Sequence, residues 1–232
     1  MNNSTVVGSI NLRTFWARRN EVFSHPWTMA VNEPVGAILA YAAYCVHLSP
    51  NQVTILSLLV STLSAAAYYY LPGTYGASLV LFLLFQIAYG LDCADGQLAR
   101  GTNTCSSFGK WLDIAVDLAG TLTIPFAMAA YGAAHSKGQL VAFYFVGGLA
   151  LAYAQVVLLF TYSMKRIIGI PGATQVSLTR KIYRFANDTG FFLFLIVPVR
   201  RSAAAILAVL FTYALMQLYT AIYVARKIEL SK

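Results

Sequence analysis

The sequence predicts an all-α, polytopic membrane protein with six transmembrane helices and an N-terminal amphipathic helix at the membrane interface. Three observations lead to this prediction. Hydrophobic residues make up 59% of the 232 residues and charged residues only 10%, against about 25% charged in a typical soluble domain. Several windows stay apolar over the ~20 residues that a spanning helix needs. The sequence also lacks the strand-like alternation that a membrane barrel requires.

Five windows are long and apolar enough to cross a bilayer, and a sixth is too short on its own. The five cover residues 52–71, 76–90 with the sequence that follows, 112–134, 139–164 and 202–224. The sixth, residues 189–199, can span only if the polar turn before it continues the same helix. We therefore expect one domain over residues 1–232, with an interfacial segment at 1–48 and a six-helix core at 49–232.

The N-terminal segment shows an amphipathic pattern and no cleavable signal peptide. Apolar side chains share one helical stripe with arginines beside it: Leu12, Phe15, Trp16, Val22 and Phe23, next to Arg13, Arg18 and Arg19. This pattern predicts a helix that lies in the membrane interface; a basic tail without regular structure is the alternative. Residues 33–47 are apolar over a shorter length and predict a re-entrant or interfacial helix.

The distribution of Lys and Arg predicts which helix ends face the cytoplasm. With six spans and the N-terminus inside, thirteen of these residues fall on the cytoplasmic side and three on the other. This arrangement places the turn between the second and third spans at the cytoplasmic face. The net charge of +8 fits contact with anionic lipid headgroups. Because the basic residues are spread over several loops, we do not expect nucleic acid as a partner.

Half of the eight acidic residues lie in one stretch, residues 89–120, which joins the second and third spans. They are Asp92, Asp95, Asp113 and Asp117. Two lie one turn apart at the end of one span, and two lie one turn apart at the start of the next. The linker is short, so we expect antiparallel neighbours with facing acidic sides. A structural network is a weak alternative, because Arg100 and Lys110 are too few cations for four carboxylates.

Four carboxylates at one point repel one another unless cations lie between them. A set of oxygen ligands without His or Cys favours a hard cation, Mg²⁺ or Mn²⁺. Such ions keep open positions that substrate phosphates fill. Gly96, Ala99 and Gly109 are small enough for a ligand to approach the backbone, and Arg100 supplies a forked cation suited to a phosphate. The pattern indicates metal-assisted phosphoryl transfer.

The same residues resemble the signature of a known family. The spacing D-x2-D-G-x2-A-R-x8-G-x3-D-x3-D matches that of the CDP-alcohol phosphotransferases, also called CDP-alcohol phosphatidyltransferases, with no departure. It is formed by Asp92, Asp95, Gly96, Ala99, Arg100, Gly109, Asp113 and Asp117. The segment SPNQVT at residues 49–54 also resembles the P-N-x-x-T that this family carries at its first span.

The resemblance implies a concrete reaction in phospholipid biosynthesis. An acceptor hydroxyl attacks the β-phosphate of a CDP-alcohol such as CDP-diacylglycerol, and CMP leaves. Two ions, Mg²⁺ or Mn²⁺, are implied: one held by Asp92, Asp95 and Asp113, and a second held by Asp92, Asp113 and Asp117. The resemblance also makes Asp117 the general base that acts on the acceptor hydroxyl.

The family's CDP-binding positions also have counterparts here. The residues implied are Asn51, Gln52, Val53, Thr54, Gly96, Ala99, Arg100, Ser106 and Gly109. Asn51 as a helix cap and Ser106 as a maker of local hydrogen bonds remain open alternatives, and capping is compatible with ligand contact. Family members often form homodimers, so a homodimer is a further expectation.

A polar segment before the short apolar window is a candidate acceptor site. It holds Arg180, Lys181, Arg184, Asn187 and Asp188. A phosphorylated acceptor would favour these cations, although the preference of basic residues for the inner side explains them equally well. We expect an integral membrane protein with its active site on the cytoplasmic face, in the cell membrane if the source is prokaryotic.

Two directions of transfer fit the signature. In the one we favour, CDP-diacylglycerol donates a phosphatidyl group to a small polar alcohol such as serine, glycerol 3-phosphate or inositol phosphate. In the other, a soluble CDP-alcohol donates its head group to a lipid or polyol hydroxyl. Two other classes are more distant. A UbiA-type prenyltransferase needs a second Asp motif, and a cation transporter would more naturally show inverted repeats and acids at mid-membrane.

Overall fold

The computed structural model describes residues 10–18, 25–168 and 184–229, whose regular structure is entirely helical. Five helices are long and apolar enough to cross a membrane. They are α3 (Pro50–Tyr70), α4 (Tyr75–Gly101), α5 (Ser107–Ala134), α6 (Leu140–Ile168) and α9 (Ala203–Glu229). The shorter helices are α1 (Leu12–Arg18), η1 (Thr28–Asn32), α2 (Glu33–Cys45) and α8 (Thr189–Val199). The protein is an all-helical integral membrane protein, as the sequence predicts.

The sixth apolar window is a helix, but it is shorter than a membrane span. α8 has 11 residues and is therefore about 16 Å long, against about 30 Å for the hydrocarbon core of a bilayer. Asp188 precedes it in an extended conformation and caps its first turn. The polar turn before α8 thus does not continue the same helix, and the condition for a span by this segment alone is not met.

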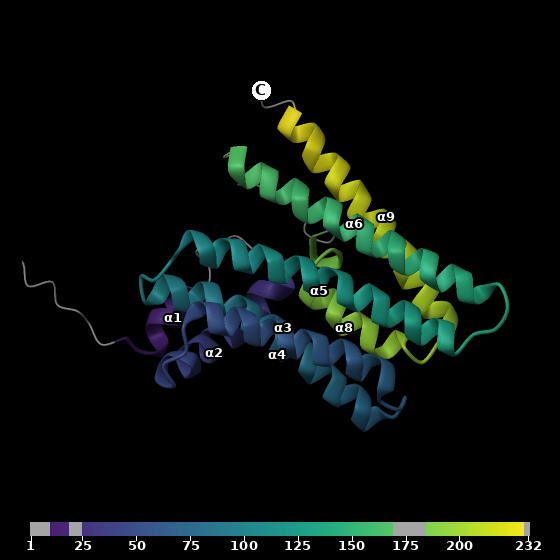
Figure 1. Ribbon diagram of the computed structural model, residues 1–232, viewed down its shortest axis with the longest axis horizontal. Coiled ribbons are helices and arrows are strands. Elements are labelled where there is room, and N and C mark those ends of the chain that lie inside the picture. Colours follow the sequence, from purple (N-terminus) through teal and green to yellow (C-terminus); the bar gives the residue numbers. More distant parts are fainter. Residues whose placement is uncertain (1–9, 19–24, 169–183, 230–232) are drawn as a thin grey trace, which may run out of the picture.

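α3 holds the two acid-bearing helices in place (Figure 1). It packs along both α4 and α5, whereas α4 and α5, both described over their full length, make hardly any direct contact with each other. The short turn at residues 102–106 joins them as the predicted antiparallel pair. α3 itself begins with Pro50 in its first turn and a capping box between Ser49 and Gln52, which fixes its start. Mounting on a common helix leaves room between the facing sides of α4 and α5.

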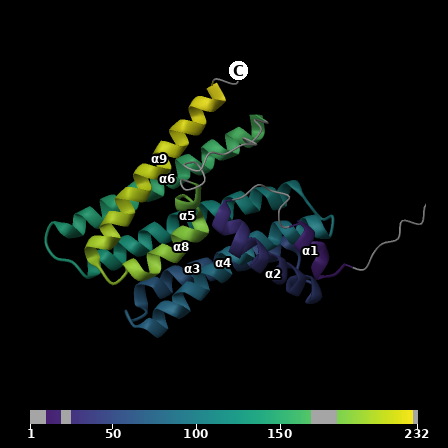
Figure 2. The same ribbon diagram turned by 180° about the vertical axis from the view of Figure 1, so that it is seen from behind.

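α2 packs closely on α4 because small residues line the contact. A Cβ atom at Gly36 would lie 2.8 Å from the Cβ of Cys93, and one at Gly90 would lie 2.7 Å from Cγ1 of Val35. Ala37 is fully buried in the same contact region. The predicted apolar segment at 33–47 is therefore largely a helix, α2, which packs on the acid-bearing helix α4 (Figure 2).

α1 differs from the predicted amphipathic stripe in one respect. Phe15 is fully buried, and its ring packs against Tyr41, Tyr44 and the backbone of Gly101. Leu12 and Trp16 remain 38% and 42% exposed. Part of the stripe therefore docks on α2 and α4. Val22 and Phe23 lie outside the described residues, and the interfacial location of this segment remains a prediction.

The end of the bundle opposite the acidic stretch is held by a buried arginine. Arg200, at the end of α8, donates hydrogen bonds to the carbonyls of Leu71 and Pro72 at the end of α3. Its guanidinium also lies 4.4 Å from the ring centroid of Tyr131 and 5.5 Å from that of Tyr68. Carbonyl dipoles and aromatic faces thus stabilise the charge and connect α8 to α3 and α5.

Two glycines of α5 offer a matched test of close helix packing, because Gly132 lies tightly against α6 and Gly120 has space around it. A Cβ at Gly132 would overlap the ring of Tyr144, whereas a Cβ at Gly120 would meet only the hydroxyl of Ser61 at 3.7 Å. We expect Gly132→Ala to lower the free energy of unfolding by about 1–3 kcal/mol through overpacking. Gly120→Ala should raise it by up to about 1 kcal/mol, because alanine favours helix. Thermal unfolding in one detergent compares the two, and a Gly132→Ala protein as stable as the wild type would contradict the close contact.

Candidate active site

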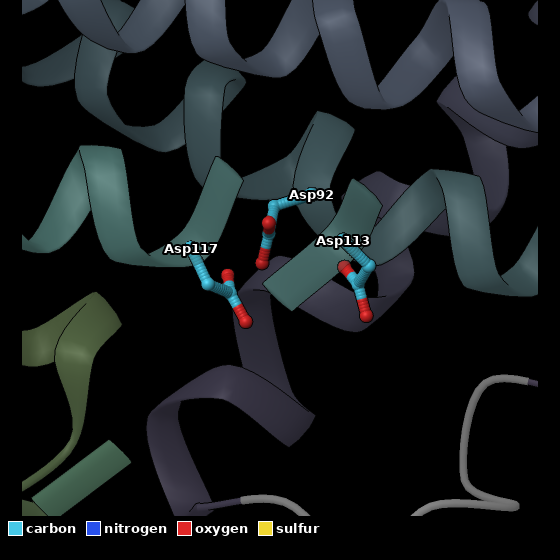
Figure 3. Close-up of side chains that lie close together, drawn as sticks. All are labelled: Asp92, Asp113 and Asp117. Atoms are coloured by element: carbon cyan, nitrogen blue, oxygen red, sulfur yellow. The ribbon is translucent and has the colours of Figure 1, made fainter. Parts of the chain in front are cut away.

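α4 and α5 bring three of the four clustered acids together (Figure 3). Asp92, Asp113 and Asp117 each offer one carboxylate oxygen, and these oxygens lie within 4.8 Å of one another. Asp92 comes from α4, while the other two lie one turn apart on α5. All three side chains are partly exposed, so a ligand can reach the group from the space between the helices.

This oxygen set fits a hard divalent cation. Carboxylate oxygens are the ligands that Mg²⁺ and Mn²⁺ prefer. Three negative charges at this spacing repel one another, and apolar surroundings strengthen the repulsion. A cation among them removes that cost, so the group formed by Asp92, Asp113 and Asp117 is a candidate metal site.

Asp95, the fourth acid, is held in a different way. It is 5% exposed; one of its oxygens accepts a hydrogen bond from the hydroxyl of Thr54, and the other accepts one from the backbone N–H of Gly96. Thr54 is buried in α3, so this contact ties α4 to α3 beside the three-carboxylate group. Asp95 lies outside that group, and its role as a metal ligand remains a prediction.

The small residues of the signature make room for polar side chains. The guanidinium of Arg100 lies over Gly96, where a Cβ would come within 2.9 Å of Nη1. A Cβ at Gly109 would lie 3.0 Å from Oγ of Ser106 and 3.1 Å from Oδ1 of Asn51. Asn51, Ser106 and Gly109 thus form one neighbourhood at the adjoining ends of α3 and α5. Ser106 also caps α5, since its hydroxyl accepts from the N–H of Gly109 at 2.9 Å.

A cavity of about 410 Å³ opens beside this neighbourhood. Its lining includes Asn51 and Ser106 together with Tyr44, His47, Leu98 and Thr102. The two residues between Asn51 and Thr54 face elsewhere. The Gln52 side chain accepts from the backbone N–H of Ser49 in the capping box, and Val53 is fully buried in an apolar cluster. Ala99 is partly exposed and offers its carbonyl to the N–H of Thr104.

Comparison with known proteins agrees with the resemblance that the signature carries. The family model described as CDP-alcohol phosphatidyltransferase matches residues 47–225, which is most of the chain and includes all the site residues that the sequence predicts. The chain belongs to the CDP-alcohol phosphatidyltransferase family. The resemblance carried by the signature is thereby confirmed. The family is one of phosphotransferases that use CDP-alcohol donors, alcohol acceptors and, in general, a divalent metal.

Two relatives share part of the sequence of this chain. An archaetidylinositol phosphate synthase of Pyrococcus horikoshii is 35% identical over 100 residues, which cover 43% of this chain and 48% of the relative. A bifunctional IPC transferase and DIPP synthase of Aquifex aeolicus is 38% identical over 69 residues, which cover 30% of this chain and 15% of the relative. The match thus spans about half the length of the first relative and a small part of the second.

The predicted acceptor residues are only partly described. Arg180 and Lys181 lie outside the described residues. Burial lowers the pKa of the Arg184 guanidinium, against the opposing influence of Tyr162 and Asp188. Burial likewise lowers the pKa of His25, which lies near Asp188 and Arg184. These groups therefore gather where the N-terminal segment meets the start of α8.

Asn187 and Asp188 are buried within this meeting point. Asn187 donates a hydrogen bond to the hydroxyl of Thr220 in α9 at 3.1 Å. Asp188 is fully buried and accepts hydrogen bonds from the N–H of Gly190 and from both the N–H and the hydroxyl of Thr28. In this structure Asp188 joins the N-terminal segment to α8, and contact with an acceptor remains a prediction for both residues.

Four polar residues that make contacts between distant segments were not singled out from the sequence: Thr28, Asn32, Gln86 and Tyr89. Thr28 contacts Tyr89 of α4 as well as Asp188, and Asn32 donates a hydrogen bond to Gln86 of α4 at 2.9 Å. Thr28 and Asn32 precede the part of the chain that matches the family model, and no motif marks any of the four. Their role follows only from contacts between distant segments.

The Thr54–Asp95 contact can be tested with a control in the same helix. Thr54→Val leaves the buried Asp95 carboxylate without its hydroxyl donor, and we expect unfolding free energy to fall by about 1.5–3 kcal/mol, as for hydrogen bonds to charged groups. Thr62 also lies in α3, but its exposed hydroxyl bonds only to the carbonyl of Leu58. Thr62→Val should change stability by less than about 0.5 kcal/mol. Equal effects in thermal unfolding would contradict a special role for Thr54.

Proposed function

We propose that this protein transfers a phosphatidyl group from a CDP-alcohol such as CDP-diacylglycerol to an acceptor hydroxyl, with release of CMP, in phospholipid biosynthesis. The observation that carries the proposal is the grouping of Asp92, Asp113 and Asp117 within 4.8 Å across the space between two helices. Family membership gives the class of donor, and the carboxylate group gives a place where a metal and a diphosphate can meet.

The proposed cofactor is Mg²⁺ or Mn²⁺, in two ions that share ligands. Asp92, Asp95 and Asp113 would hold one, and Asp92, Asp113 and Asp117 the other. Such ions neutralise phosphate oxygens and stabilise the charge that develops as the diphosphate bond breaks. The chain's own contribution is to hold the carboxylates in position, which it does by mounting α4 and α5 on α3.

The proposed donor site covers the adjoining ends of α3, α4 and α5. Arg100 lies over Gly96 in the same helix as Asp92, and its forked cation suits a phosphate oxygen. Asn51 and Ser106, next to Gly109, border a cavity of about 410 Å³ and offer hydrogen-bonding groups to the polar part of the nucleotide. We assign Thr54 and Ala99 supporting places in this site, and Gln52 and Val53 the role of fixing the start of α3.

Asp117 is the proposed general base. It takes the proton of the acceptor hydroxyl as the acceptor oxygen bonds to the β-phosphorus of the donor. The bond from that phosphorus to the bridging oxygen breaks, and CMP leaves with the electron pair. Asp117 suits this role because it lies one turn further along α5 than Asp113 and its partly exposed carboxylate belongs to the same group.

The proposed acceptor is a phosphorylated polyol, with inositol phosphate as the first to test. The Pyrococcus horikoshii relative is named for an archaetidylinositol phosphate product. Arg184, near the start of α8, and the neighbouring Arg180 and Lys181 of the sequence supply charge for the acceptor phosphate, with Asn187 and Asp188 shaping the region. Transfer from a soluble CDP-alcohol to a lipid or polyol hydroxyl is the alternative direction, and comparison of the two donors in one assay separates them.

We further propose that the site faces the cytoplasm. Arg100 and Lys110 flank the turn between α4 and α5, and the bias of basic residues to this side supports the orientation. A sixth crossing by the part of the chain that includes α8 remains part of this proposal. We also propose a homodimer, located in the cell membrane if the source is prokaryotic. Cysteine labelling of a variant with a single cysteine, introduced at Asn103, reports the side on which the turn lies.

The proposed reaction is tested by CMP release from purified protein in detergent or lipid discs. With CDP-diacylglycerol, an inositol phosphate acceptor and Mg²⁺ or Mn²⁺, we expect CMP release that a chelator abolishes. Asp117→Asn should lower the rate at least roughly 100-fold, as expected when a general base is lost.

Glu229→Gln at the end of α9 is the matched control, because it also removes one negative charge but lies in a different helix from the carboxylate group. This control should retain the wild-type rate. Absence of CMP release with every CDP-alcohol tested, or full activity of Asp117→Asn, would contradict the proposal. Metal-dependent ion flux without CMP release would point to a transporter instead.

A further inference from the structure

A chain of hydrogen bonds links the N-terminal segment and α8 to the acid-bearing helix. Asp188 Oδ1 accepts from the hydroxyl of Thr28 at 2.7 Å, and the same hydroxyl oxygen lies 3.2 Å from the hydroxyl of Tyr89. Thr28 begins η1, Asp188 caps α8 and Tyr89 lies in α4. Three elements that are distant in sequence therefore meet at two hydroxyl groups.

The direction of these hydrogen bonds follows from a proton count. Asp188 Oδ2 accepts from the N–H of Thr28 at 3.0 Å, and Oδ1 accepts from the N–H of Gly190 at 2.9 Å. Both oxygens thus already act as acceptors toward backbone N–H groups, and the Thr28 hydroxyl donates its single proton to Oδ1. The remaining contact of Thr28 can only be an accepted one, so the Tyr89 hydroxyl donates to Thr28.

This direction leaves the Tyr89 oxygen as a hydrogen-bond acceptor toward the rest of its surroundings. Its one proton is committed to Thr28, and its lone pairs remain available to another donor. Phenylalanine would lack this oxygen, and a tyrosine free to rotate would present either its proton or its lone pairs. The Thr28 proton goes to Asp188, so the Tyr89 proton goes to Thr28 and the lone pairs of Tyr89 are what its hydroxyl presents.

Tyr89 is adjacent to the carboxylate group. It precedes Asp92 by three residues in α4, a spacing that puts the two on one face about 5–6 Å apart at Cβ. Helical side chains lean toward the N-terminus, so the Asp92 carboxylate leans toward the turn that carries Tyr89, while the Tyr89 ring leans toward the turn before it and its hydroxyl meets Thr28. The phenol interacts electrostatically with both Asp92 and Asp188. In Figure 3 the purple ribbon near the carboxylates is the N-terminal segment, whose element η1 contacts α4.

The short element η1 adds a second reason to connect this contact with the site. It is a π-helical turn that runs directly into α2, and such turns are rare and occur often at functional sites. Thr28 within it is 4% exposed, and its N–H is satisfied by Asp188 from another part of the chain. The π-helical turn therefore presents both polar groups of Thr28 toward α8 and α4.

We propose that Tyr89 is a positioning residue of the metal site: its hydroxyl oxygen, oriented by Asp188 through Thr28, accepts a hydrogen bond from water in the hydration shell of the cation at Asp92 and Asp117. Mg²⁺ and Mn²⁺ retain several waters when a few carboxylates bind them. Partners that hold the outer shell tune metal affinity. This inference rests on the proposed function for the presence of the metal, but its test does not depend on turnover.

The test measures Mn²⁺ binding to the full-length protein by electron paramagnetic resonance, together with thermal unfolding. We expect Tyr89→Phe, which keeps the ring, to weaken Mn²⁺ binding roughly tenfold or more. Thr28→Val, which keeps the shape of the side chain but removes the hydroxyl, should weaken it similarly. Thr28→Ser restores the hydroxyl and should bind Mn²⁺ like the wild type. The double variant Tyr89→Phe with Thr28→Val should bind no more weakly than Tyr89→Phe alone, because one interaction is lost once.

The outcomes separate this inference from the proposed reaction. If the wild type binds Mn²⁺ but releases no CMP, the proposed reaction fails and the four variants still decide the role of Tyr89. If Tyr89→Phe binds Mn²⁺ as tightly as the wild type, the role of Tyr89 is refuted whatever the activity. If Thr28→Ser is as weak as Thr28→Val, the effect comes from packing and the hydroxyl chain is refuted. Absence of Mn²⁺ binding by the wild type refutes it too.

Discussion

Mutual repulsion of Asp92, Asp113 and Asp117 is the constraint on which the rest of the structure depends. Their oxygens approach within 4.8 Å in a protein with few other acids, and isolated carboxylates in such surroundings are costly. The arrangement therefore needs a scaffold that holds the acidic faces of α4 and α5 together. It also needs a positively charged ligand that offsets the repulsion among the carboxylates.

The scaffold is visible in the packing of the helices. α3 contacts both α4 and α5 and ties itself to α4 through the Thr54–Asp95 hydrogen bond. α2 supports α4 from another side through contacts between small residues. At the other end, Arg200 connects α8 to α3 and α5. Each contact restricts one helix relative to its neighbour, and together they leave an accessible space where the carboxylates face one another.

The sequence predicted the helical class, the five long spans and the meeting of the acidic faces, because apolar length and helical spacing are local properties. The eight-position signature identified the family for the same reason. Local patterns could not show that Asp95 turns to Thr54, since that choice depends on the packing of α3 against α4. They also could not show that Phe15 is buried, because an amphipathic stripe packs equally well on lipid and on protein.

The N-terminal contacts lay furthest beyond sequence reasoning. Thr28 and Asp188 are 160 residues apart, and neither belongs to the signature. Asp188 stood out in the sequence as an acid beside a helix start, which suggested an acceptor site, and the structure gives it a hydrogen-bonding role between helices. Its capping of α8 and its hydrogen bonds with Thr28 follow from the structure.

The central claim is that the three carboxylates of α4 and α5 form one cation site for phosphoryl transfer. Anomalous diffraction from crystals of the full chain grown with Mn²⁺ tests it most directly. We expect an anomalous peak from Mn²⁺ coordinated by Asp92, Asp113 and Asp117. Crystals that show Mn²⁺ only elsewhere, or none at these carboxylates under conditions that support CMP release, would contradict it.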